Sequence, residues 1–189
     1  MKSDGAAEPQ TMADVSDSTH LRRATEADAT LLAELAARLF EDTFGPDNDP
    51  EDMRDYLAGA FSEEHQRAEL ADDTRLVWIA LDASGRAIGY AAMRRDTRTH
   101  GVIAERPAEV QRIYADHAWH GRGIGRALMA ACVEQARTWG CDVLWLAVWE
   151  RNPRAIAFYE KTGFRKVGRQ IFVLGRDVQH DDVMALSLD

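Results

Sequence analysis

The stretch that decides the fold runs from residue 109 to residue 126 and reads EVQRIYADHAWHGRGIGR. Glu109 to Ala115 has the pattern of a β-strand, and the run from His120 to Gly125 is rich in glycine. The helix predicted after this run ends at Gly140 and carries apolar residues at helical spacing: Ile124, Leu128, Ala131, Cys132, Ala136 and Trp139. Glycines let a ligand approach the backbone closely, and the unpaired amides of a first helical turn favour an anion. The stretch therefore predicts a phosphate or diphosphate site.

Two familiar phosphate loops do not match this stretch. A dinucleotide fingerprint requires a third glycine where Arg126 stands, and the Walker pattern is absent. The pattern that remains is [Gln/Arg]-x-x-Gly-x-[Gly/Ala], which Gly123 and Gly125 fit, with His120 in the place of Gln or Arg. A tight strand-to-helix turn with nothing bound is the alternative interpretation. Arg122 and Arg126 favour phosphate over that alternative.

Strands and helices alternate on both sides of this stretch. Their order predicts an α/β protein (an α+β mixed sheet) covered by helices, in one domain over residues 19–189. Residues 1–18 lack periodicity and are predicted to be a disordered leader. The expected strands cover residues 20–24, 76–81, 87–94, 143–149, 164–174 and 183–188, and the other expected helices run from Thr25 to Gly45, from Pro50 to about Leu70, and from Asn152 to Gly163.

Composition excludes several classes of protein. The chain has 189 residues, of which 46% are hydrophobic and 29% charged, as expected for one globular domain. No apolar run approaches the ~18 residues of a membrane helix, and residues 1–20 contain no signal-like apolar segment. The net charge of −9 argues against nucleic-acid binding. Two cysteines, Cys132 and Cys141, suggest neither a disulfide framework nor a metal cluster, so a reducing cytoplasm is expected.

A resemblance to a known family extends over about His20 to Asp189. The Gly-rich loop and its preceding strand resemble those of the GNAT N-acetyltransferases. Two later segments share this resemblance: Asn152-x-x-Ala155-x-x-Phe158-Tyr159 and Gly163-Phe164. A finer set of segments is similar to the bacterial spermidine/spermine acetyltransferase branch: Phe44-Gly45-Pro46, Val110 to Tyr114, Val148 to Asn152, and Val173-Leu174-Gly175 with Gln179, Asp181 and Met184.

The resemblance implies the mixed-sheet GNAT fold and an acetyl-CoA-dependent transfer to the primary amine of a small cationic acceptor, with polyamines as the first hypothesis. One alternative is acetylation of a protein or peptide N-terminus or lysine. Another is a non-catalytic sensor that binds acyl-CoA. The closing strands are also a candidate homodimer contact.

The resemblance also implies which residues hold the cofactor, with no metal required. The diphosphate would lie on the backbone of the Gly-rich loop, and the pantetheine arm would pair with the preceding strand where that strand separates from its parallel neighbour. Asn152 is either a helix N-cap alone or an N-cap that also contacts the pantetheine arm. The implied residues are Ile113, Tyr114, Ala115, His120, Gly121, Arg122, Gly123, Ile124, Gly125, Arg126 and Asn152. Because His120 replaces the usual Gln or Arg, cofactor affinity is expected to be weaker or pH-dependent.

Two residues are predicted to move protons. Family members commonly place a tyrosine at the position of Tyr159, near the thioester sulfur, so Tyr159 is the expected general acid; a core aromatic is the alternative. A primary amine is rarely neutral at pH 7, a handicap of ~4.6 kcal/mol, so a base is needed. Glu109 is the candidate base, acting through water, with Asp116 a weaker choice and an ordinary surface carboxylate the alternative. Alternation along the strand would place residues 109, 111, 113 and 115 on one face of the sheet.

Other patterns bear on the acceptor and the mechanism. Seven acidic residues lie between positions 41 and 55, and they predict either a negative mouth for a cationic amine or a solvated helix face. His117 and His120 alone make a poor metal site. The chain has no Gly-x-Ser-x-Gly motif and neither cysteine adjoins the proposed site motifs, which favours direct transfer in a ternary complex. The seven acidic residues are Glu41, Asp42, Asp47, Asp49, Glu51, Asp52 and Asp55.

Overall fold

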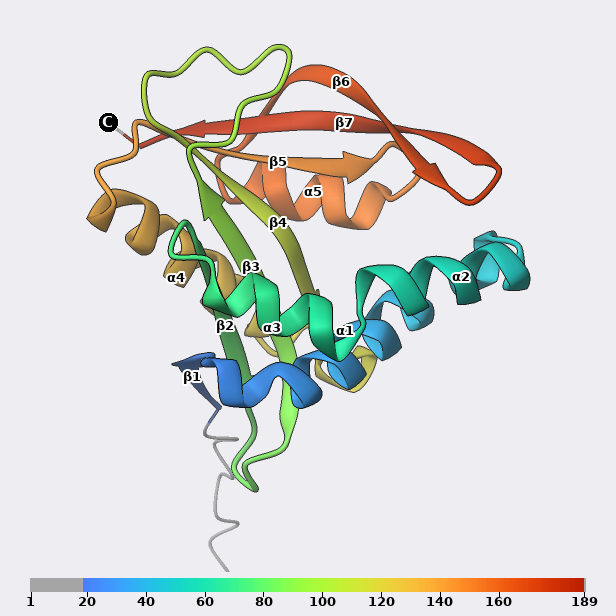
Figure 1. The fold of residues 1–189 in the computed structure, drawn as a ribbon. Helices are drawn as coiled ribbons and strands as arrows, with labels where there is room; N and C mark the ends of the chain where they lie inside the picture. Colours follow the sequence, from blue (N-terminus) through green and yellow to red (C-terminus); the bar gives the residue numbers. More distant parts are fainter. Residues whose placement is uncertain (1–18, 189) are drawn as a thin grey trace, which may run out of the picture.

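The computed structural model describes residues 19–188, so the leader predicted over 1–18 lies outside the described residues. The described chain forms one seven-stranded mixed sheet in the order β1-β2-β3-β4-β5-β7-β6 (Figure 1). The predicted mixed sheet is therefore confirmed. The strands are β1 (His20–Arg23), β2 (Arg75–Leu81), β3 (Ala87–Arg95), β4 (Pro107–Ala115), β5 (Val143–Trp149), β6 (Arg165–Leu174) and β7 (Asp177–Ser187).

Helices cover both faces of the sheet and divide the core in two. One cluster of buried residues joins the sheet to α4 and α5, and the other joins it to α1 and α2. Figure 1 shows α1 and α3 in front of the strands and α4 behind them. The helices are α1 (Ala29–Phe44), α2 (Pro50–Ala60), α3 (Glu63–Ala71), α4 (Ile124–Thr138) and α5 (Pro153–Lys161).

Two predicted boundaries are wrong for local reasons. The single helix expected from Pro50 to about Leu70 is two helices, because Ser62 adopts an extended conformation and its side chain caps α3 by accepting from the His65 amide at 3.2 Å. The last strand begins at Asp177 instead of Val183. Its first six residues are mostly polar, so they show no apolar run, although they pair with β6.

The sheet separates between its two parallel strands. The two strands pair only where Pro107–Glu109 of β4 lies beside Val143–Trp145 of β5. Beyond that point β4 continues beside β3 as far as Ala115, and β5 continues beside β7 as far as Trp149. A wedge therefore opens through the sheet between the two strands, and the predicted separation of the strand before the Gly-rich loop is confirmed.

A β-bulge interrupts β4 within this wedge. Val110 pairs with Met93 of β3, but the next partner, Ala92, pairs with Arg112. Gln111 is thus an extra residue on β4, and the alternation of side chains shifts by one after it.

The shift corrects the prediction that residues 109, 111, 113 and 115 share one face. Ala108 and Val110 belong to the core on the α4 side, which places the intervening Glu109 on the opposite, α1 side. After the bulge, Ile113 and Ala115 pack on the α4 side. Strict alternation failed because one inserted residue reverses every side chain that follows it.

Candidate active site

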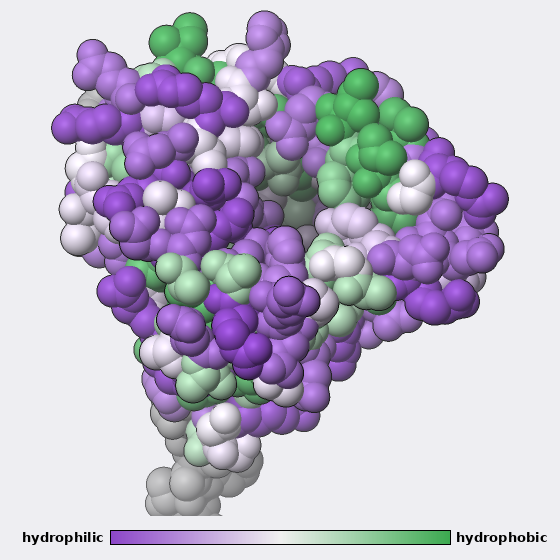
Figure 2. All heavy atoms as spheres, viewed as in Figure 1, coloured by the Kyte–Doolittle hydropathy of each residue, from purple (hydrophilic) through white to green (hydrophobic). Residues whose placement is uncertain are grey.

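The wedge forms a cleft of about 1350 Å³ that passes between β4 and β5. Figure 2 shows a hollow in this face of the molecule, with polar side chains around much of its rim. We call the part near the start of α4 the loop side and the part near α1 and α2 the aromatic side. Every residue predicted for the site lines this cleft: Glu109, Ile113, Tyr114, Ala115, His120, Gly121, Arg122, Gly123, Ile124, Gly125, Arg126, Asn152 and Tyr159.

The Gly-rich loop owes its shape to two glycines. Gly121 and Gly123 have φ angles of +79° and +89°, in the left-handed region that glycine adopts without strain. Gly123 is the N-cap of α4, and its carbonyl accepts the first helical hydrogen bond from Ala127 at 2.9 Å. The amides of residues 124–126 therefore have no acceptor within the helix. They are the kind of donors that bind a phosphate group.

Positive side chains gather around these amides. Arg122, Arg126 and Arg154 line the cleft, and the Arg122 guanidinium lies 5.1 Å from the Trp119 ring centre. At the start of α5, Asn152 accepts a hydrogen bond from the Ala155 amide at 3.1 Å, which confirms its N-cap interpretation. The loop side thus combines backbone donors with a positive surround.

His120 ties the loop back to the end of β4. Its Nε2 lies 2.9 Å from the Ala115 carbonyl oxygen, and its ring lies 4.5 Å from that of His117. Burial and the nearby Arg154 lower the pKa of the His120 imidazole. The ring is therefore neutral at pH 7, unlike an arginine at the same position.

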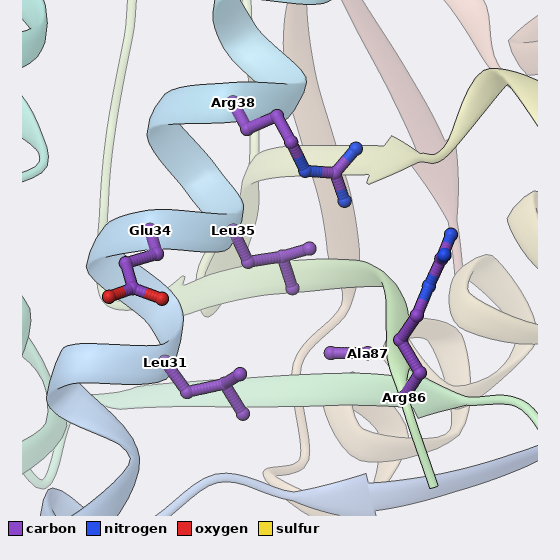
Figure 3. Close-up of a pocket in the computed structure, with 6 residues that line it drawn as sticks. All are labelled: Leu31, Glu34, Leu35, Arg38, Arg86 and Ala87. Carbon is purple, nitrogen blue, oxygen red and sulfur yellow. The ribbon is translucent and has the colours of Figure 1, made fainter. Parts of the chain in front are cut away.

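Asp116 anchors the loop to α1 and to the start of β3. Its Oδ2 accepts from Arg38 at 3.2 Å and from Arg86 at 3.0 Å, and its Oδ1 accepts from the Ala118 amide at 3.1 Å. Figure 3 shows both arginines among the residues that line a second pocket. Burial raises the pKa of the Asp116 carboxyl, but the Ala118 amide and Arg38 outweigh it and lower the pKa overall. The carboxylate that was the weaker candidate base is thus engaged in holding the loop.

Tyr159 lies on α5, where the core and the cleft meet. It is 8% exposed, and its ring lies 5.3 Å from Phe158 and 6.0 Å from Phe164. Burial raises the pKa of its phenol, so the hydroxyl keeps its proton at neutral pH. The side chain is part of the core and also lines the cleft, as both sequence interpretations required.

Glu109 lies at the narrow end of the wedge, where it pairs with Trp145 in the last step shared by β4 and β5. Burial raises the pKa of its carboxyl, while a hydrogen bond from Gln111 and the charges of Arg75 and Arg94 oppose the shift. Glu109 is thus a half-buried carboxylate compensated by neighbouring donors.

Apart from Tyr114, a predicted cofactor contact, the aromatic side contains residues to which the sequence motifs assigned no chemical role. Ring centres there lie 4.6 to 6.3 Å apart, and the set is drawn from five separate segments of the chain. Asp181 of β7 also lines the cleft and is 9% exposed. No local motif joins these positions, because only the strand register and helix packing bring them together. The aromatic residues are Phe40, Phe44, Tyr56, Phe61, Tyr114, Trp149 and Phe172.

The acidic stretch divides between two uses. Asp42 and Asp47 line the cleft. Asp49 caps α2 through the Glu51 amide at 2.9 Å, and Asp52 binds Arg176 at 3.3 Å. Two members of the stretch therefore line the cleft, while others have structural roles, and the negative mouth stays a prediction.

Two kinds of feature are absent from residues 19–188. That part of the chain contains no group of three or more His, Cys, Asp or Glu side chains placed to hold a metal ion. None of its helices is long and apolar enough to cross a membrane.

Comparisons with known proteins agree with this geometry. An uncharacterized N-acetyltransferase of Lactobacillus delbrueckii subsp. lactis is 32% identical over 87% of this chain and 94% of its own. The N-alpha-acetyltransferase RimI of Mycobacterium tuberculosis is 35% identical over 76% of this chain and 77% of its own. The crystal structure of the PaiA N-acetyltransferase of Thermoplasma acidophilum with coenzyme A covers 90% of this chain and 99% of its own, with a TM-score of 0.72 and 21% identity.

The profile of the Acetyltransferase (GNAT) family matches residues 32–164, a span that includes β4, the Gly-rich loop, α4, β5 and α5. The loop amides, the wedge in the sheet and the position of Tyr159 all lie within it. This chain therefore belongs to the acetyltransferase (GNAT) family.

Proposed function

We propose that this acetyltransferase transfers acetyl from acetyl-CoA to the primary amine of a small cationic acceptor. The observation that carries the proposal is a single cleft with phosphate-binding amides on one side and aromatic rings with carboxylates on the other. The diphosphate binds the backbone of residues 120–126 and the pantetheine arm follows Ile113 to Ala115 beside Asn152. The PaiA protein, which has a similar fold, was solved in complex with coenzyme A, and this supports coenzyme A as the ligand class.

The reaction runs by direct transfer in the ternary complex. The amine nitrogen attacks the thioester carbonyl, a carbon–nitrogen bond forms and the carbon–sulfur bond breaks. The departing thiolate takes the proton of the Tyr159 hydroxyl, which water then restores. A thiol with a reference pKa near ~8.5 is a modest base, and a phenol that remains protonated in the cleft suits this step.

The proton lost by the amine passes through water to Glu109 in this proposal. Burial raises the pKa of the Glu109 carboxyl and so makes it a stronger base than an exposed glutamate. Its position on the α1 side of the sheet places it with the aromatic side of the cleft, where the acceptor binds.

A polyamine is the first acceptor to test. Asp42 and Asp47 at the cleft attract a cation, and methylene chains pack well on aromatic rings. The finer resemblance to the spermidine/spermine branch rests on the sequence motifs alone. Acetylation of a protein N-terminus is a second candidate, because the RimI relative named an N-alpha-acetyltransferase shares 35% identity with this chain.

Thiol release from acetyl-CoA across polyamines, amino acids, aminoglycosides and peptides tests these proposals. Spermidine should give the highest kcat/KM among them. A neutral or peptide amine that is acetylated faster would discard the polyamine assignment. Acetyl-CoA binding without turnover on any amine would instead support a sensor.

A further inference from the structure

We propose that Asp181 binds the ammonium group of the acceptor, and that the acceptor's carbon chain packs on the aromatic rings around it. The inference rests on the proposed function and names the substrate class of the same site. That class is a primary ammonium on an apolar carbon chain. It includes alkylamines, arylalkylamines and polyamines, whose amino groups are joined by methylene chains.

Strand register directs the Asp181 side chain into the cleft. Asp181 pairs with Trp149 of β5 and with Gln170 of β6, and residues directly opposite in a sheet point to the same face. The Trp149 ring lies 6.1 Å from that of Phe44 in α1, which identifies the face as the α1 side. All four residues line the cleft.

The carboxylate of Asp181 is buried without compensation. Among residues 19–188, no side chain or backbone group donates a hydrogen bond to it or forms an ion pair with it. Its neighbour Asp182 points to the other face and is paired with Lys166 and with Arg169. A buried carboxylate without a partner is costly, and a cation from outside the chain would satisfy it.

The electrostatic surroundings of Asp181 disfavour its charged form. Burial first, and then the charges of Asp182 and Glu150, raise the pKa of the Asp181 carboxyl to about 6. His180 acts in the opposite direction. A positive ligand beside Asp181 would relieve both the burial cost and the repulsion between the acids.

The surroundings of Asp181 select the rest of the acceptor. Tyr56 of α2 lies across the cleft within electrostatic range of Asp181, and its ring lies 5.7 Å from Phe172. Aromatic faces attract ammonium groups and pack against methylene chains. Glu109 differs, because the Gln111 hydrogen bond and two arginines already compensate its charge. Of Glu109 and Asp181, Asp181 is therefore the carboxylate that remains for the ammonium.

The test compares Asp181→Asn with Asp182→Asn, which makes the same change one residue away on the opposite face. Steady-state assays use acetyl-CoA with butylamine, phenethylamine and spermidine. We expect Asp181→Asn to raise the KM of each amine by roughly 10- to 100-fold, the worth of a hydrogen bond to a charged group. The KM of acetyl-CoA should stay within about twofold. Asp182→Asn should leave both constants near those of the wild type.

Stability and pH distinguish binding from a structural role. Removing an uncompensated buried charge should raise the melting temperature in Asp181→Asn, whereas Asp182→Asn loses ion pairs and should lower it. In the wild type the KM of the amine should rise as the pH falls through about 6, because Asp181 becomes neutral. This change should be absent in Asp181→Asn. The other ionisable groups around Asp181 are Tyr56, Glu150, Arg169, His180 and Asp182.

Three results would overturn the inference. They are an unchanged amine KM in Asp181→Asn, an equal rise in Asp182→Asn, and a wild-type amine KM that is constant from pH 5 to 7.5. The last requires no variant, so it decides the matter even if Asp181→Asn does not fold. If the wild type acetylates no amine, the proposed function fails as well. The absence of thiol release from the wild type would show this before any variant is made.

Discussion

The two sides of the cleft are built in different ways. The loop side is made from one continuous stretch, in which β4 ends, two glycines adopt positive φ and α4 begins, so its donors are backbone amides. The aromatic side is made from side chains of α1, α2, β4, β5, β6 and β7 that meet only in the folded chain. A backbone site can keep one geometry while a side-chain site changes with each substitution.

Tyr159 lines the cleft and is the proposed proton donor, so its loss should affect turnover most. Tyr159→Phe should lower kcat by ~10²- to 10⁴-fold because the thiolate loses its proton donor, while acetyl-CoA binding remains near normal. Steady-state kinetics and calorimetry measure the two quantities. Tyr90→Phe is the matched control, because Tyr90 is also buried but does not line the cleft. A kcat retained in Tyr159→Phe would remove Tyr159 as the general acid.

A substitution at Gly123 tests whether the loop side binds acetyl-CoA through its backbone. Gly123→Ala places a side chain on a residue with φ of +89°, at a cost of about 1 kcal/mol, and should raise the Kd of acetyl-CoA by about 10-fold. Gly85 has φ of +84° in the turn between β2 and β3, and an added Cβ has open space at both glycines.

Gly85→Ala should therefore cost similar stability and leave acetyl-CoA binding unchanged, as thermal melts and calorimetry would show. Equal losses of affinity in the two variants would mean that Gly123 acts through general stability and not through the loop.

The sequence predicted the loop side well and the aromatic side poorly. The Gly-rich loop, α4, β5 and Asn152 as an N-cap follow from local rules about glycine, helix starts and apolar runs. The bulge at Gln111 has no sequence signal of comparable strength, and it reverses the faces of all later β4 residues.

Asp181 belongs to the finer resemblance, but its role could not be assigned from sequence for a similar reason. It lies in a polar segment that shows no strand periodicity, and its direction depends on pairing with β5 and β6. Residues whose roles depend on long-range register need the folded structure, whereas residues whose roles depend on neighbours in the chain do not.

The role of the aromatic side in acceptor binding can be tested at Phe44, whose ring lies 4.6 Å from Phe40 and 6.3 Å from Tyr114. Phe44→Ala should raise the KM of an arylalkylamine by about 5-fold through lost apolar contact. The Kd of acetyl-CoA should not change, because the ring lies on the opposite side from the loop. An equal rise in the Kd of acetyl-CoA would show that the loop side and the aromatic side do not bind their ligands independently.

The smallest effect is expected at His120. Its pKa is lowered by burial, by Arg154 and by His117, while the Ala115 carbonyl and Asp116 act in the opposite direction. The ring is neutral at pH 7 and gains a proton only at lower pH, where its charge would attract the diphosphate. The Kd of acetyl-CoA should therefore fall by roughly two- to threefold between pH 7.5 and 5.5, and His120→Gln should abolish this trend. If the Kd of acetyl-CoA depends on pH in the same way in the wild type and in His120→Gln, then His120 protonation does not affect cofactor binding.

The most direct measurement is calorimetric titration of acetyl-CoA into the wild type, Gly123→Ala and Asp181→Asn. If the diphosphate binds the amides at the start of α4, the wild type releases or absorbs heat on binding and Asp181→Asn has a Kd within about twofold of it. Gly123→Ala then binds about 10-fold more weakly. No heat with folded wild-type protein, or equal affinity in Gly123→Ala, would contradict the account.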